Sequence, residues 1–169
     1  MARILLLITL LSVSEFTHSV PDFYAENKAL KFLEKTLKVK ELELGERIDF
    51  TDQLDEGRKV VAYPFSYPGK PEKYFAVFTE SKGRYDMFDY LLITDKEGEI
   101  QQVKVLRYRS EHGGEIASKK WLSQFEHYKG GDLYYEEEIS AISGATISAM
   151  SITRDIPKVV YIIQAYAEN

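Results

Sequence analysis

Hydrophobic residues change their spacing along the chain, and the first pattern is helical. Between Phe23 and Leu37 the apolar side chains recur at intervals that place them on one face of a helix. Asp22 comes directly before this run and is a favoured N-cap residue. We therefore expect an amphipathic helix here that packs on the body of the protein by one face.

From Leu42 to Tyr108 the spacing between apolar residues shortens, and β-branched and aromatic residues become frequent. Glycine or proline separates the apolar runs, which is typical of strands joined by turns. Gly98 can adopt the positive φ that a hairpin turn requires, and Lys82-Gly83 is expected to form another turn or a bulge. The pattern predicts an antiparallel meander with strands over 59–65, 73–80, 85–95 and 99–108.

The last third of the chain returns to helical spacing. A short helix is expected over 121–128, followed by a loop over 129–138 with an acidic end and a closing helix over 148–167. Pro157 is the weak point of the closing helix, because it lacks a backbone donor and can kink or split a helix. No repeat and no long linker divides the chain, so we expect one domain of the α+β class, an antiparallel sheet flanked by helices.

The first nineteen residues have the features of a secretory signal peptide. A positive charge at Arg3 precedes the apolar run from Ile4 to Leu11, and small residues at Thr17 and Ser19 precede a cleavage position before Val20. The run is too short to span a membrane as a helix. We expect an exported, periplasmic or otherwise extracytoplasmic protein whose mature part, about 150 residues, suits a single domain.

Composition narrows the chemistry that this domain can carry. The chain has no cysteine, which excludes disulfides, thiolate-bound iron–sulfur clusters and thioether-linked haem. Its net charge of −5 makes nucleic acid an unfavourable partner. Because the cysteine-dependent redox groups are excluded, electron transfer by this chain would need an organic cofactor. No convincing catalytic acid or base and no metal site stands out in the sequence.

The segment ISGATIS, residues 142–148, directly precedes the closing helix and has two explanations. In the first, Ser143 is an ordinary N-cap and Gly144 eases the bend into the helix. In the second, the unpaired N–H groups and the positive end of the helix dipole bind a phosphate. Small residues at Gly144 and Ala145 would leave room for it, and Thr146 and Ser148 would add hydroxyl groups. No basic residue lies within the segment, which argues against a nucleotide-hydrolysing loop.

A second candidate segment, RSEHGGEIASKKWLSQF, covers residues 109–125 after the last predicted strand. Its adjacent glycines, Gly113 and Gly114, would let the backbone approach a flat ligand closely. A loop between a strand and a helix also uses glycine for ordinary turns, and both interpretations are open. The remaining candidate ligand contacts in this segment are Glu111, His112, Glu115, Ile116 and Trp121.

The order of these segments resembles the FMN-binding domain shared by the C and G subunits of sodium-pumping and Rnf-type electron-transport complexes and by small exported flavoproteins. The resemblance covers roughly residues 85–163, and SGAT followed two places on by a hydroxyl residue is its most specific part. It implies an electron carrier with FMN as cofactor, bound between the 110–116 loop and the 143–148 helix start.

The resemblance also implies how the flavin is held and which partners are needed. In that family the phosphate of FMN forms a phosphodiester with the last threonine of the motif, which corresponds here to Thr146. A flavin transferase makes this bond outside the cytoplasm, and membrane or extracytoplasmic redox partners exchange electrons with the flavin. The implied cofactor-binding residues are Glu111, His112, Gly113, Gly114, Glu115, Ile116, Trp121, Ser143, Gly144, Ala145, Thr146, Ile147 and Ser148.

One position departs from the family pattern. The motif usually begins with an aspartate three residues before its serine, and this chain has Ser140 there. The alternative function is therefore a noncatalytic extracytoplasmic binding or assembly module that has lost the flavin. A hydrolase that uses Ser143 with His112 or His127 is the least favoured function, because the chain lacks a nucleophile-elbow pattern.

Overall fold

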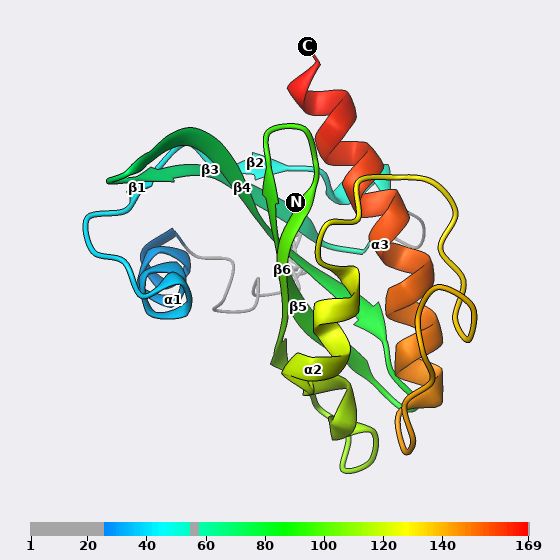
Figure 1. The fold of residues 1–169 in the computed structure, drawn as a ribbon. Helices are drawn as coiled ribbons and strands as arrows, with labels where there is room; N and C mark the ends of the chain where they lie inside the picture. Colours follow the sequence, from blue (N-terminus) through cyan, green and yellow to red (C-terminus); the bar gives the residue numbers. More distant parts are fainter. Residues whose placement is uncertain (1–25, 55–57, 169) are drawn as a thin grey trace, which may run out of the picture.

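The computed structural model describes residues 26–54 and 58–168, so the predicted leader and the Asp22 cap lie outside the described residues. Its elements form an antiparallel sheet with helices on both faces, which confirms the α+β class (Figure 1). In chain order they are α1 (Glu26–Leu37), β1 (Glu43–Leu44), β2 (Ile48–Asp49), η2 (Thr51–Gln53), β3 (Val60–Tyr67), β4 (Lys70–Lys82), β5 (Met87–Asp95), β6 (Ile100–Arg107), η4 (Gly114–Ala117), α2 (Lys119–Leu122), η5 (Ser123–Phe125) and α3 (Thr146–Ala167).

The sheet has the strand order β1-β3-β4-β5-β6, and β2 pairs with a second part of β3. Every pairing is antiparallel, so the predicted meander from β3 to β6 is confirmed. Gly98 has φ +83° in the turn between β5 and β6, as the sequence predicted. The Asp95 carboxylate accepts the N–H groups of Glu97 and Glu99 and fixes this turn. The two-residue strands β1 and β2 were not predicted, because they are too short to show a period.

Both faces of the sheet are buried. Side chains such as Ala62 and Val77 pack towards α2 and α3, and alternate residues such as Tyr63 and Phe78 pack towards α1. Figure 1 shows α1 on one side of the sheet and α3 on the other. This arrangement explains why β5 is apolar almost throughout instead of alternating, since its residues 88–94 are all buried.

Three helix predictions are modified by the structure. The closing helix α3 begins at Thr146, two residues earlier than expected, and it continues past Pro157 without interruption. The second helix is shorter than 121–128, because α2 ends at Leu122 and one turn of 3₁₀ helix follows to Phe125. The buried face of α3 includes Ile152, Ile156 and Val159. The packing of this face stabilises the helix by more than the loss of one backbone hydrogen bond at Pro157 destabilises it. In the described ranges, no helix is both long and apolar enough to cross a membrane.

A buried charged network fixes α3 on the sheet. Asp155 of α3 is fully buried and forms an ion pair with Arg58, which is 6% exposed. The Ser81 hydroxyl of β4 donates to the same carboxylate at 2.6 Å. A buried charge is stable only when it is paired and hydrogen-bonded, so this network holds the helix in one register against β4.

Candidate functional site

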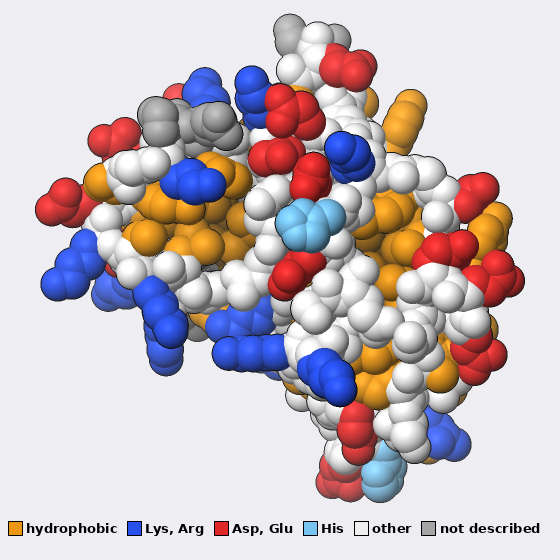
Figure 2. Space-filling view, in the orientation of Figure 1, with side chains coloured by type: hydrophobic (Ala, Val, Ile, Leu, Met, Phe, Trp, Pro, Cys, Tyr) orange, Lys and Arg blue, Asp and Glu red, His pale blue; other side chains and the backbone are white. Residues whose placement is uncertain are grey.

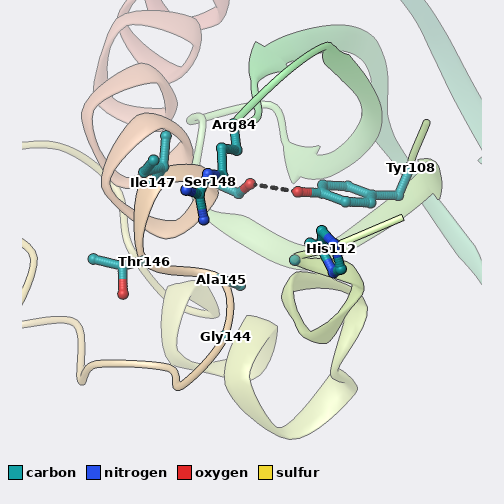
Figure 3. A pocket seen from close by; sticks show the side chains of 9 residues that line it. Arg84, Tyr108, His112, Gly144, Ala145, Thr146, Ile147 and Ser148 are labelled. Atoms are coloured by element: carbon teal, nitrogen blue, oxygen red, sulfur yellow. Dashed lines mark hydrogen bonds between the residues drawn. The ribbon is translucent and has the colours of Figure 1, made fainter. Parts of the chain in front are cut away.

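Three segments distant in sequence meet at one end of the sheet. They are the β4–β5 turn, the segment that follows β6, and the first turn of α3. Gly83 donates to the Asp86 carbonyl at 2.8 Å, which confirms the turn predicted at Lys82-Gly83. The segments enclose a cavity of about 280 Å³ (Figure 3), here called the motif cavity. Its walls are Arg84, Tyr108, His112, Gly113, Gly144, Ala145, Thr146, Ile147 and Ser148.

The start of α3 lacks a side-chain cap. Its N-cap residue is Ala145, and Ser143 is exposed and outside the helix, so the N-cap explanation for Ser143 is wrong. The backbone N–H groups of Thr146, Ile147 and Ser148 form no hydrogen bond with any other described residue. The first turn also contains no acidic residue. The positive end of this 22-residue helix therefore stays available to an anion.

Gly144 makes the sharp turn that leads into this helix start. Its φ is +85°, a region that favours glycine. A Cβ at this position would lie 3.0 Å from the carboxyl carbon of Glu115. The loop after β6 thus packs directly against the SGAT segment.

The hydroxyl groups of the motif have different surroundings. Ser148 is 1% exposed, and its Oγ lies 2.9 Å from the Tyr108 hydroxyl in a hydrogen bond. Thr146 is exposed at the first position of α3, and Figure 3 shows its side chain pointing away from that hydrogen bond. Ser143 is exposed but precedes the helix. Thr146 is therefore the motif hydroxyl that combines solvent access with a place at the helix start.

Gly113 and Gly114 have different roles although they are adjacent. Gly113 has φ +95°, and a Cβ there would overlap the hydroxyl of Tyr108. At Gly114 a Cβ would meet no atom within 4 Å, and its φ is not positive. Gly113 is thus required by the fold of the cavity wall, whereas Gly114 leaves open space at the surface.

Sequence reasoning missed two residues of the cavity wall, Arg84 and Tyr108. Arg84 supplies the positive charge that the SGAT segment lacks, and its guanidinium carbon lies 5.2 Å from the centre of the Tyr85 ring. The predicted meander contained the signal for both residues. In a meander the turn before β5 and the end of β6 lie at the same end of the sheet, so residues from both can reach one site.

An ion pair holds the segment after β6 in place. Arg109 donates to the buried Asp89 carboxylate at 2.7 Å and to the Met87 carbonyl at 2.7 Å. Both acceptors belong to β5, so the segment that carries Tyr108 is fixed to the sheet immediately beside the cavity. The cavity wall therefore has a rigid base.

The structure brings seven of the predicted site residues to the cavity wall and places the others nearby or in the core. Glu111 borders an adjoining hollow with Arg109, and Gly114, Glu115 and Ser143 are exposed. Ile116 and Trp121 are buried in the core below, 0% and 6% exposed. The residues on the cavity wall are His112, Gly113, Gly144, Ala145, Thr146, Ile147 and Ser148.

Neither histidine supports the hydrolase hypothesis. Ser143 forms no hydrogen bond with a histidine within the described part of the chain. The Nδ1 atom of His127 lies 2.9 Å from Glu99 Oε1, at the opposite end of β6 from the motif cavity. The site has the features of an anion-binding cavity with an accessible hydroxyl, and a nucleophile–base pair is not formed.

Comparison with known sequences agrees with this geometry. Residues 85–159 match the model of a family described as the FMN-binding domain. The matched range begins next to Arg84, ends within α3, and contains both the segment after β6 and the SGAT motif. No curated protein matches the chain.

Proposed function

Through residues 85–159 the chain belongs to the FMN-binding domain family, and we propose that it is an exported electron carrier whose FMN is attached by its phosphate to Thr146. The observation that supports this most directly is the exposed Thr146 hydroxyl at the uncapped start of α3, on the wall of the motif cavity. When bound, FMN supplies transfer of one or two electrons.

The residues of the motif cavity fit a phosphate group. The free N–H groups of the first turn of α3 are donors for phosphate oxygens, and the helix dipole favours the negative charge. Arg84 adds a cation on the same wall. Glycine is required at position 144, because a Cβ there would press against the Glu115 carboxylate. The cavity thus combines donors, positive charge and space.

Thr146 is also the residue that can form the covalent bond. In the proposed attachment its hydroxyl oxygen bonds to the phosphorus of the FMN half of FAD and loses its proton, the pyrophosphate bond breaks, and AMP leaves. A flavin transferase would catalyse this step, so the hydroxyl must be reachable by another protein. Thr146 meets that condition, whereas Ser148 is buried and bonded to Tyr108.

Ser140, at the position where the family has aspartate, occupies a fixed and accessible place. Its N–H donates to the Gln124 side chain at 2.9 Å, and its carbonyl accepts the Trp121 indole N–H at 2.7 Å. Both bonds use the backbone, and the residue is exposed. An aspartate here would keep both bonds, so Ser140 leaves the fold of the site unchanged and removes only a surface carboxylate.

Mass spectrometry tests the proposal. Protein coexpressed with a flavin transferase in an exporting host should begin near Val20, gain the mass of FMN less one water, and stay yellow after denaturation. Thr146→Ala should abolish this gain, and Thr146→Ser should retain it because the hydroxyl remains. Ser143→Ala is the matched control, since it removes a neighbouring exposed hydroxyl and should leave the modification intact.

Ser140 supports the alternative, a binding or assembly module without flavin, and the same experiment separates the two functions. Ser140→Asp should raise the fraction of protein that carries FMN if the transferase recognises a carboxylate at this position. Ser140→Asn should not raise it. A wild-type protein that stays unmodified beside a fully modified Ser140→Asp variant would refute a natural covalent flavin, and a colourless native wild type as well would favour the alternative. Intact Met1 on protein recovered from the cytoplasm would contradict export.

A further inference from the structure

A second, larger hollow lies beside the motif cavity. This loop groove, about 820 Å³, is bounded by the 131–137 loop and α3, and it shares Thr146 and Ile147 with the motif cavity. Its surface includes Tyr134, Ile147 and Met150, which are 53%, 46% and 54% exposed. Large apolar side chains grouped on a surface are typical of interaction sites. The protein therefore presents an apolar surface directly beside Thr146.

The loop that bounds this groove has a fixed shape. The Glu136 N–H donates to the Ile139 carbonyl at 2.8 Å, and the Tyr134 N–H donates to the Glu138 carboxylate at 2.9 Å. Ile139 is 1% exposed and anchors the loop in the core. Because its backbone is hydrogen-bonded and anchored, the loop displays its outward side chains in a defined arrangement.

The rim of the loop groove is acidic. Asp132, Glu136 and Glu137 line it, against a single cation, Arg154. Among the described residues, none of these three carboxylates has an ion-pair partner. Figure 2 shows acidic side chains beside exposed apolar ones along the edge formed by this loop and α3. The groove also contains Thr153, whose buried hydroxyl has no partner within the described ranges.

We propose that the loop groove is the docking surface for a positively charged electron-transfer protein. The occupant would present lysine or arginine side chains beside an apolar contact, because carboxylates without an ion pair among the described residues lie beside exposed apolar side chains here. An apolar centre with a polar rim is the usual anatomy of an interface, and opposite charge accelerates encounter. This inference rests on the proposed function, since Thr146 is shared by the groove and the motif cavity.

Small redox probes of opposite charge test the electrostatic part. The reduced flavoprotein is mixed with hexaammineruthenium(III), a trication, or with ferricyanide, a trianion. Each reduced flavin gives two electrons, one to each of two metal complexes, and releases two protons to the buffer. The variant Glu136→Gln/Glu137→Gln should slow oxidation by ruthenium about tenfold at an ionic strength of ~0.01 M and about threefold at ~0.15 M. Oxidation by ferricyanide should accelerate to a similar extent.

The matched control removes two carboxylates elsewhere. Glu43 and Glu46 are exposed near β1, across the sheet from the groove, and Glu43→Gln/Glu46→Gln should change either rate less than twofold. If both pairs of substitutions change the rates equally, only the net charge matters and the docking surface is refuted.

A second measurement uses the protein without flavin. Titration of the ¹⁵N-labelled chain with hexaamminecobalt(III), which is diamagnetic, should shift amide signals of residues 132–138 and 147–150. The Glu136→Gln/Glu137→Gln variant should lose these shifts, and shifts elsewhere instead would refute the groove. If the wild type carries no flavin, the proposed function fails. The titration then still tests whether the loop groove binds a cation. A dimer in sedimentation velocity that Met150→Arg dissociates would show that a second copy covers the groove, and would overturn the proposal.

Discussion

The contact between Gly113 and Tyr108 gives a quantitative test of how the motif cavity is built. Gly113→Ala introduces a Cβ in left-handed backbone, which costs about 1.5 kcal/mol. The same Cβ displaces the Tyr108 hydroxyl from Ser148 and leaves a nearly buried serine hydroxyl unpaired, for about 1.5 kcal/mol more. We therefore expect a loss of about 3 kcal/mol in the free energy of unfolding, measured by urea denaturation.

A double-mutant cycle separates the two contributions. Tyr108→Phe alone loses the hydrogen bond and should cost about 1.5 kcal/mol. In the Phe background the nearest atom to the new Cβ is the ring Cζ at 3.1 Å, which the ring relieves by moving a few tenths of an ångström, so Gly113→Ala should then cost mainly the backbone contribution. The double variant should lose about 3 kcal/mol in total, whereas additivity would give about 4.5 kcal/mol.

Gly114 is the matched control for this cycle. Gly114→Ala meets no atom within 4 Å and should change the free energy of unfolding by no more than about 0.5 kcal/mol. If both alanine variants lose the same stability, or if the cycle is additive, the packing of Gly113 on Tyr108 does not shape the cavity. Flavin content per folded molecule, measured on the same samples, should fall for Gly113→Ala and not for Gly114→Ala.

Two further predictions concern buried or partly buried charged side chains. Asp155→Ala should cost about 3–5 kcal/mol in urea denaturation, because it removes the buried carboxylate that pairs with Arg58 and accepts the Ser81 hydroxyl. Combined Asp155→Leu and Arg58→Met should recover most of that loss, and an equally unstable double variant would contradict this account. Burial, together with the nearby charges of Lys119 and Lys35, lowers the pKa of Lys104. The unfolded chain thus binds more protons between the folded pKa and the usual lysine pKa, and stability from Lys104 should rise with pH through that window. Lys119→Gln should stabilise the protein by a few tenths of a kcal/mol at low salt, and an effect that persists at ~1 M salt would contradict the electrostatic cause.

The sheet was predictable because the signals for its strands and turns lie within short stretches of the sequence. The strands from β3 to β6 carry β-branched and aromatic runs with glycine or proline between them, and the turn at Gly98 needs a residue that tolerates positive φ. The closing helix was predictable from its period, but its first residues were not, because SGAT contains no apolar repeat. The length of the second helix was overestimated. Aromatic residues around Phe125 are buried in the core, and in the sequence their spacing resembles the apolar face of a helix.

The site was predictable only as far as its residues are neighbours in sequence. Gly113 and the SGAT segment stand out as small residues at element boundaries, whereas Arg84 is an ordinary charged residue in a turn. Its role depends on the meander bringing that turn beside α3, which no local pattern records. Trp121 was proposed near the flavin because it is aromatic, and the structure instead uses its indole N–H to hold the backbone of Ser140.

The geometry of α3 explains how one helix can serve three purposes. Residues two apart on a helix point about 200° away from each other, so Thr146 and Ser148 necessarily face different surroundings. Ser148 faces the sheet and bonds to Tyr108, and Asp155, two turns further along the same buried face, fixes the helix through Arg58. Thr146 faces solvent together with Met150, one turn further along, beside the acidic loop. Because one rigid helix carries both faces, the anchoring contacts on the buried side set the position of the proposed attachment hydroxyl and of the docking surface on the other.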